Sequence, residues 1–264
     1  FRIKTKGFFF LLRKLFNENN NKFFSHNIQA HIILNLLKIL KRSIKKKDKN
    51  KYYNVIHFDP FYIKKFWLYI FLKTLKCSNS NIIFVSEYAR NQFMMKINFP
   101  INYFIIYNSV SNKYFDKKNK IKLIKQNKSS HINIGFIGRH ANVKRLPLFL
   151  EIILELNKIQ KDKFKFFIQS DISKKDLDKL LKKIYSKKNQ LPNNKLNIIL
   201  YSSGNDPLVF YNSIEILIST SKTETFGLTC IEAIAMKKKL YTINSLSIET
   251  LFGPVNFNIK EDSV

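Results

Sequence analysis

The chain has 264 residues, 45% of them hydrophobic, which is enough to bury the cores of two modest domains. Its 47 Lys and Arg residues outnumber its 18 Asp and Glu residues and give a formal net charge of +29, which suits nucleic acid or an anionic membrane as a partner. Only six basic residues are Arg, the residue that specific readers of nucleic acid favour, so no nucleic-acid partner is expected. Most Lys residues are expected on solvated faces.

The composition excludes further classes of protein. The two cysteines, Cys77 and Cys230, are too few for a disulfide framework or a zinc site. Both lie among apolar residues, which predicts buried thiols in a reducing, cytoplasmic environment. The longest unbroken apolar run, 66–72, is too short to span a bilayer.

The first half of the chain alternates short apolar runs with longer amphipathic segments. Expected strands cover 22–25, 52–56, 81–85 and 103–107, and expected helices cover 28–44, 61–76 and 87–95. The Lys-rich run 45–51 predicts a solvated loop. A second polar, Lys-rich stretch follows, and 116–130 is expected to link two domains.

The second half alternates strands and helices more regularly. Expected strands cover 132–137, 164–168, 196–201, 214–218 and 240–243, and expected helices cover 143–159, 174–187 and 206–212, with one after 227 and another near 247. Repeated strand–helix units predict a parallel sheet covered on both faces. This half should therefore be a Rossmann-like α/β domain, whose ligands bind beyond the carboxyl ends of its strands.

Two glutamates, Glu224 and Glu232, flank the predicted start of a helix in the second half. Between them lies Phe226-Gly227-Leu228, where the glycine allows a turn into an apolar helix. A helix N-terminus attracts phosphate, and carboxylates on either side can accept hydrogen bonds from sugar hydroxyls. The arrangement suits a nucleotide sugar. The alternative is a loop glutamate and an unrelated helix-surface glutamate.

This segment resembles the E-x7-E motif of retaining glycosyltransferases with the GT-B fold, most closely glycosyltransferase family 4 (glycosyl transferases group 1). The resemblance implies that Glu224 contacts the donor sugar and that Glu232 contacts the nucleotide ribose. Segments 85–88 and 106–110 resemble late landmarks of the family's N-terminal domain. The implied reaction moves a sugar from a nucleotide-sugar donor to a glycan or lipid-linked acceptor, with retention at the anomeric carbon.

The resemblance also implies a domain organisation. Residues 1–115 would form a partial, acceptor-side Rossmann-like domain, and 131–264 a nucleotide-sugar-binding one that is incomplete at its end. The two parallel sheets would face each other across a cleft. Because the chain begins with Phe1 and only fifteen residues follow Glu249, we expect a fragment with little turnover.

Two cations follow the first strand of the second half, in Gly138-Arg139-His140-Ala-Asn-Val-Lys144. Across a strand–helix turn, Arg139 and Lys144 can converge on one anion. Fixed cations stabilise the charge that builds up on a departing diphosphate. The pair resembles the family's diphosphate-binding Arg and Lys. The alternative is a basic turn in a Lys-rich chain.

Histidines provide weaker candidates. His57 closes a predicted strand, where the family often has a histidine that faces the sugar, and His26 resembles an earlier histidine of the same domain. A lone histidine is more often structural. Asp176 and Asp178 have the D-x-D spacing of metal-binding glycosyltransferases but lie in a Lys-rich helical stretch, which predicts a solvated helix face. Neither a metal nor another cofactor is expected.

Two segments mix aromatic residues with Lys, as interfacial helices do: 8–16 and 61–73. They suggest peripheral attachment to an anionic membrane, and the alternative is core helices with snorkelling lysines. Two other functions remain open for the chain as a whole. One is a basic nucleic-acid-binding protein, and the other is a catalytically inactive glycosyltransferase-like remnant.

Overall fold

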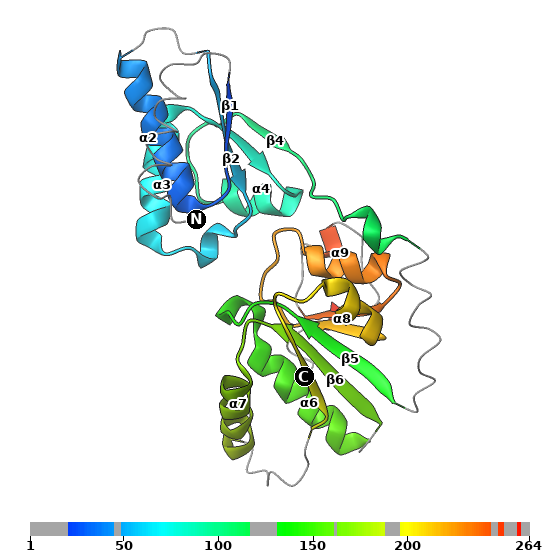
Figure 1. The fold of residues 1–264 in the computed structure, drawn as a ribbon. Coiled ribbons are helices and arrows are strands. Elements are labelled where there is room, and N and C mark those ends of the chain that lie inside the picture. Colours follow the sequence, from blue (N-terminus) through cyan, green and yellow to red (C-terminus); the bar gives the residue numbers. More distant parts are fainter. Residues whose placement is uncertain are drawn as a thin grey trace. The chain divides into compact units, whose positions relative to one another are not determined.

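The computed structural model describes residues 21–44, 49–116, 131–160, 163–187, 196–243 and 248–250, and the backbone of 258–259. The chain divides into two compact units, Phe1–Asn108 and Ser109–Val264, coloured blue to cyan-green and green to red (Figure 1). The expected linker, 116–130, lies outside the described residues except for Asp116, and so does the aromatic segment 8–16.

Unit 1 is built on a parallel sheet with the order β1-β2-β3-β4. Its strands are β1 (Lys22–Ser25), β2 (Lys51–Ile56), β3 (Asn81–Phe84) and β4 (Tyr103–Ile105), and its helices are α2 (Ile28–Ile44), α3 (Lys65–Ser78) and α4 (Glu87–Met94), with a 3-10 turn η1 (Pro60–Tyr62). Consecutive strands are neighbours, and a helix connects each of the first three strands to the next. The α2 helix packs on α3 and on the first two strands, and α4 packs on β3.

The helix expected at 61–76 starts later than its sequence pattern indicates. Pro60 opens η1, where the Asp59 carboxylate accepts a hydrogen bond from the Phe61 amide at 2.9 Å. The α-helix begins only at Lys65, and Asn79 ends it in the left-handed conformation with φ 47°. As a result, the aromatic residues of 61–73 divide between a turn and a helix.

Unit 2 contains a parallel sheet with the order β10-β9-β8-β5-β6-β7. Its strands are β5 (Ile132–Ile137), β6 (Phe164–Ser170), β7 (Ile198–Ser202), β8 (Ile216–Ser219), β9 (Lys239–Ile243) and β10 (Asn258–Ile259); its helices are α6 (Leu146–Ile159), α7 (Lys174–Lys187), α8 (Pro207–Ser213) and α9 (Leu228–Ala235), with 3-10 turns η2 (Asn112–Tyr114) and η3 (Asn142–Lys144). The chain runs from β5 to β7 on one side of β5. It then returns to β8 on the other side, so the strand order reverses between β5 and β8.

Helices cover both faces of the unit 2 sheet (Figure 1). One core joins Phe136 of β5 to apolar residues of α6 and α7, and the other joins Leu217 of β8 to residues of α8 and α9. Gly135 of β5 allows α8 to approach the sheet closely, because a Cβ there would lie 2.7 Å from the Phe210 ring. A parallel sheet with helices on both faces confirms the Rossmann-like prediction for this half of the chain.

Some local expectations were wrong. The helix expected from Val143 begins at Leu146, because Arg145 takes a left-handed conformation with φ 49° and separates η3 from α6. Cys77 is exposed, whereas Cys230 is buried as predicted.

Among the described residues, no helix is long and apolar enough to cross a membrane.

Candidate active site

Two loops that follow adjacent parallel strands are joined by hydrogen bonds at the carboxyl edge of the unit 2 sheet. The Thr220 hydroxyl donates to the carbonyl oxygens of Lys144 and Arg145, at 2.8 and 3.1 Å. In return, Arg145 Nε donates to the Thr220 carbonyl at 2.6 Å, and the Lys222 amide donates to the Val143 carbonyl at 2.7 Å. These loops leave β5 and β8, so they meet where the strand order reverses, the usual ligand site of such sheets.

Lys144 and Glu224 form an ion pair between the two loops, in which Lys144 Nζ donates to Glu224 Oε1. The side chains are only 19% and 12% exposed, respectively. A Cβ on Gly138 would lie 3.5 Å from the Lys144 stem, so the lysine crosses directly over this glycine on its way to Glu224. The structure therefore brings together three of the residues predicted from sequence.

Gly227 provides the turn between the glutamate loop and α9. Its φ is 76°, and an added Cβ would lie 2.3 Å from Cδ1 of Ile248. Only glycine therefore fits this position without strain. The flanking residues differ in exposure, since Phe226 is buried and Leu228 is 41% exposed.

Glu232 lies on α9 and is held by tyrosines from outside the motif. The Tyr211 hydroxyl donates to Glu232 Oε2 at 2.8 Å, and it lies 3.0 Å from the Thr229 carbonyl. The Tyr114 hydroxyl also donates a hydrogen bond to the Glu232 carboxylate. The Tyr114 ring packs edge-on against the Tyr211 ring, with 5.8 Å between the ring centres. Burial raises the pKa of Glu232, while the two tyrosine hydroxyls and the charge of Lys113 oppose this shift.

Cys230 lies close to the ion pair but is not suited to nucleophilic chemistry. Its side chain is fully buried, and burial together with the negative charge of Glu224 raises the pKa of its thiol to about 12. A thiol with this pKa is almost entirely protonated at neutral pH. Cys230 therefore belongs to the core beneath α9.

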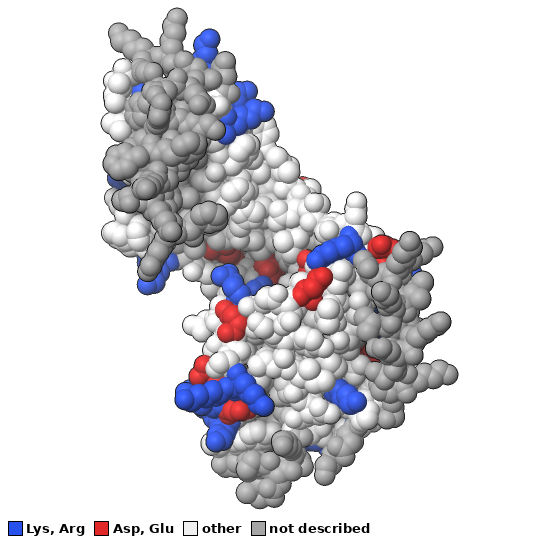
Figure 2. Space-filling view, viewed as in Figure 1, with Lys and Arg blue, Asp and Glu red and all other residues white. Residues whose placement is uncertain are grey.

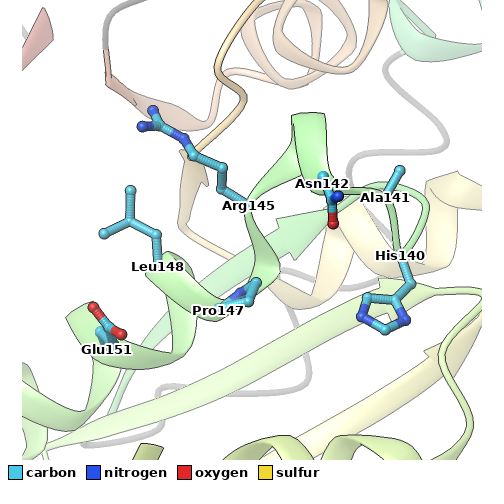
Figure 3. A pocket seen from close by; sticks show the side chains of 7 residues that line it. All are labelled: His140, Ala141, Asn142, Arg145, Pro147, Leu148 and Glu151. Carbon is cyan, nitrogen blue, oxygen red and sulfur yellow. The ribbon is translucent and has the colours of Figure 1, made fainter. Parts of the chain in front are cut away.

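Arg139 is exposed at the surface of unit 2. Within the described part of the chain, its guanidinium has no ion-pair or hydrogen-bond partner. The loop after it, together with the first turns of α6, lines an open pocket of about 440 Å³. Figure 3 shows His140 and Asn142 on one side of the start of α6 and Arg145 on the other, with its guanidinium directed away from them.

Unit 1 places two histidines together at the carboxyl ends of its first two strands. His26 Nδ1 and His57 Nε2 lie 3.0 Å apart, so one ring donates a hydrogen bond to the other. Burial and the neighbouring His26 lower the pKa of His57. A third histidine, His31, is fully buried and hydrogen-bonds the Ser25 hydroxyl at 2.6 Å.

Asp176 and Asp178 lie on the exposed face of α7, as predicted. Asp176 accepts a hydrogen bond from the Ser173 hydroxyl at 2.6 Å and pairs with Lys179 at 3.4 Å. Figure 2 shows this mixture of basic and acidic side chains over α7. In the described ranges, no group of three or more His, Cys, Asp or Glu residues could hold a metal ion.

The sequence model of the family described as Glycosyl transferases group 1 matches residues 117–253, more than half of the chain. The chain belongs to the group 1 glycosyl transferases. Both loops of the site and all of α9 lie within the matched segment. No curated protein matches the chain.

Solved structures resemble this group 1 glycosyl transferase over most of its length. Anabaena Alr3699/HepE in complex with UDP-glucose is 13% identical, with a TM-score of 0.74 over 94% of this chain and 66% of that one. TarM, which one structure attributes to S. aureus, is 21% identical, with a TM-score of 0.70 over 95% of this chain and 47% of that one. The likenesses confirm the GT-B fold, and the chain spans two thirds or less of these structures.

The structure also identifies residues of the site that the sequence did not indicate. Tyr114 and Tyr211 come from distant segments, and no spacing rule links them to Glu232. For Arg145 the sequence offered one weak signal: arginine is rare in this chain, with six in all, and this one directly follows Lys144. Thr220 is fully buried directly after a short apolar strand, a position compatible with many structural roles.

Proposed function

We propose that this chain provides the donor-binding machinery of a retaining, metal-independent glycosyltransferase of family 4. The supporting observation is the junction of the β5 and β8 loops, where Lys144 and Glu224 pair at the point of strand-order reversal. Among the similar structures, Alr3699/HepE is in complex with UDP-glucose, and a TarM variant is in complex with UDP and α-GlcNAc-glycerol. These complexes support a nucleotide sugar as donor and a glycan as acceptor, and we propose a lipid-linked glycan as the second possible acceptor.

The roles proposed for the charged residues follow from their positions. The diphosphate lies near Gly138, within reach of the Arg139 guanidinium and the Lys144 ammonium. The donor sugar lies against Glu224 and the first turn of α9, at Gly227 and Leu228. Glu232 accepts hydrogen bonds from the ribose. The tyrosine hydroxyls on Glu232 fix the orientation of its carboxylate for this purpose.

The proposed reaction moves one glycosyl group. The bond between the anomeric carbon and the diphosphate oxygen breaks, and the diphosphate keeps the electron pair. The acceptor hydroxyl bonds to the anomeric carbon on the same face and gives its proton to the departing diphosphate. Arg139 and Lys144 stabilise the charge that develops on the leaving group. Because Lys144 already pairs with Glu224, one lysine can connect the sugar and diphosphate positions.

His57 is proposed to contribute from the acceptor-side unit. Its lowered pKa keeps the ring neutral near pH 7, so that it can donate one hydrogen bond and accept another. Its contact with His26 fixes the orientation of the ring at the end of β2. A neutral histidine suits contact with sugar hydroxyls.

Saturation-transfer NMR with a panel of UDP-, GDP- and ADP-sugars tests the proposal, because it detects binding without turnover. We expect a saturation-transfer signal from the sugars of one nucleotide class. Glu232→Ala should weaken their binding free energy by about 1–3 kcal/mol, the contribution of a charged hydrogen bond. Glu224→Ala should mainly reduce discrimination among sugars. Glu155→Ala, at a glutamate of α6 whose side chain is 46% exposed, is the matched control. Equal signals from wild type and Glu232→Ala would exclude the assignment.

A further inference from the structure

The α3 helix of unit 1 has aromatic side chains on its solvent face. Phe66, Trp67 and Tyr69 are 66%, 36% and 60% exposed. Phe71 and Leu75 of the same helix are buried in the core of the unit. The alternative of a core helix with snorkelling lysines therefore fits one face of α3 and leaves the other face unexplained.

The exposed aromatic residues continue onto neighbouring elements. Phe61 and Tyr62 of η1 are 50% and 49% exposed, and Met95, directly after α4, is 68% exposed. The elements are in contact, since α4 packs against η1 and the Lys96 ammonium lies 3.7 Å from the Phe61 ring centre. We call this set the aromatic surface: Phe61, Tyr62, Phe66, Trp67, Tyr69 and Met95.

Lysines surround the aromatic surface. They are all exposed: Lys64, Lys65, Lys73, Lys76 and Lys96. Segments 60–78 and 95–99 contain no Asp or Glu. The Lys73 ammonium lies 5.4 Å from the Tyr69 ring centre, so charge and aromatic face are closely interleaved.

We propose that the aromatic surface binds the headgroup region of an anionic phospholipid bilayer. Aromatic rings favour the membrane–water interface, where their apolar bodies are buried and their polar groups stay hydrated. Each lysine near an anionic leaflet adds electrostatic attraction. The surface joins both features on a helix about 21 Å long, given 14 residues in α3.

Charge makes a second copy of the chain a poorer partner. A symmetric dimer through this surface would oppose the same five lysines on both copies, and no acidic residue of these segments would offset them. Single-stranded nucleic acid stacks on aromatic rings, commonly with help from Arg. Segments 60–78 and 95–99 contain no Arg, so lipid is the better match.

Trp67 is the only tryptophan of the chain, so its fluorescence reports on this surface in the unmodified protein. The experiment adds phosphatidylcholine vesicles with or without 30% phosphatidylglycerol, a composition of about one anionic lipid in three. We expect a blue shift of Trp67 emission with the anionic vesicles only, and quenching by brominated lipid. Both effects require the ring to enter the bilayer interface.

Variants separate this surface from the general positive charge. Phe66→Ser/Tyr69→Ser should weaken vesicle binding about tenfold or more, because two interfacial aromatic side chains are lost. The control Ile159→Ser/Val209→Ser, at residues of unit 2 that are 76% and 50% exposed, should bind normally. Circular dichroism checks that all variants are folded.

Lysine variants provide the second comparison. Lys64→Gln/Lys65→Gln should also weaken binding by about tenfold, whereas Lys175→Gln/Lys183→Gln on α7 should have little effect. Three results would overturn the proposal. They are unchanged Trp67 emission while the protein co-sediments with vesicles, a shift that depends on protein concentration without lipid, and a larger shift with oligouridine than with vesicles. None of them bears on nucleotide binding by unit 2.

Discussion

Lys144 and Glu224 lie 80 positions apart in the sequence, yet they form an ion pair at the edge of the unit 2 sheet. The pair joins a basic turn and an acidic motif, each of which has an ordinary structural explanation by itself. Their contact makes a shared site the more economical explanation. It also means that either residue should support the fold as well as the ligand.

Removing one partner of the ion pair should destabilise unit 2. Lys144→Met leaves a carboxylate that is 12% exposed without its cation, which we expect to cost about 2 kcal/mol of unfolding free energy. Lys158→Met is the matched control, because its pair with Glu155 is 42% and 46% exposed and should contribute less than about 1 kcal/mol. Urea denaturation measures both. An equal effect of the two substitutions would contradict the structural role of the Lys144 pair.

The turn at Gly227 should not accept a side chain. Gly227→Ala forces a left-handed backbone on alanine and places a methyl group against Ile248, so we expect a loss of about 1–3 kcal/mol. Gly204→Ala is the control, because the nearest atom to its added Cβ would be 3.9 Å away. Thermal melting compares them. A stable Gly227→Ala variant would show that the loop has another conformation.

The pH dependence of uridine binding should report on Glu232. Its pKa is raised by burial, and only the ionised carboxylate accepts hydrogen bonds from both ribose hydroxyls. Uridine affinity should therefore fall as the pH drops through the raised pKa. Tyr211→Phe removes a hydrogen bond that lowers this pKa, so the midpoint should move to higher pH. Uridine is the ligand of choice here because it has no phosphate group, which would itself titrate near pH 6.

Glu232→Gln is the control for this titration, because its side chain cannot ionise. Its uridine affinity should be weak and nearly independent of pH. If the Gln variant keeps the pH profile of the wild type, another group titrates and the ribose assignment is wrong.

The buried histidine of unit 1 should make the stability of the protein sensitive to acid. Burial lowers the pKa of His31 to about 3, so the unfolded chain binds a proton near pH 6.5 that the folded chain does not. Stability should therefore fall as the pH drops from about 6.5 towards 3, by at most about 1.4 kcal/mol per pH unit. His31→Gln should remove this part of the slope. Identical slopes of unfolding free energy against pH in both proteins would contradict the assignment.

The sequence predicted best those elements whose patterns are local. The helix at 174–187 matches α7 at both ends, because its apolar period and its Lys-rich face both lie within the segment. Ser173, directly before it, accepts a hydrogen bond from the Asp176 amide. The start of α6 was missed, because the left-handed Arg145 depends on hydrogen bonds to Thr220, a residue 75 positions away. Local propensity contains no information about that contact.

The candidate site shows the same division. The spacing of Glu224 and Glu232 and the glycine between them could be read from one segment. The partners of Glu232 could not, since Tyr114 and Tyr211 reach it through tertiary packing. The sequence also gave no sign that His26 and His57 lie in contact, which follows from the register of β1 beside β2.

The central claim is that the loops after β5 and β8 hold a nucleoside diphosphate, and titration calorimetry of Arg139→Ala tests it most directly. Arg139 is exposed, so its loss should leave the fold intact. The account predicts that affinity for the matching nucleoside diphosphate falls about tenfold to a hundredfold, while affinity for the nucleoside stays unchanged. Lys175→Ala on α7 should change neither value. Unchanged diphosphate affinity in Arg139→Ala, and also in Arg139→Ala/Lys144→Ala, would show that the anion binds elsewhere.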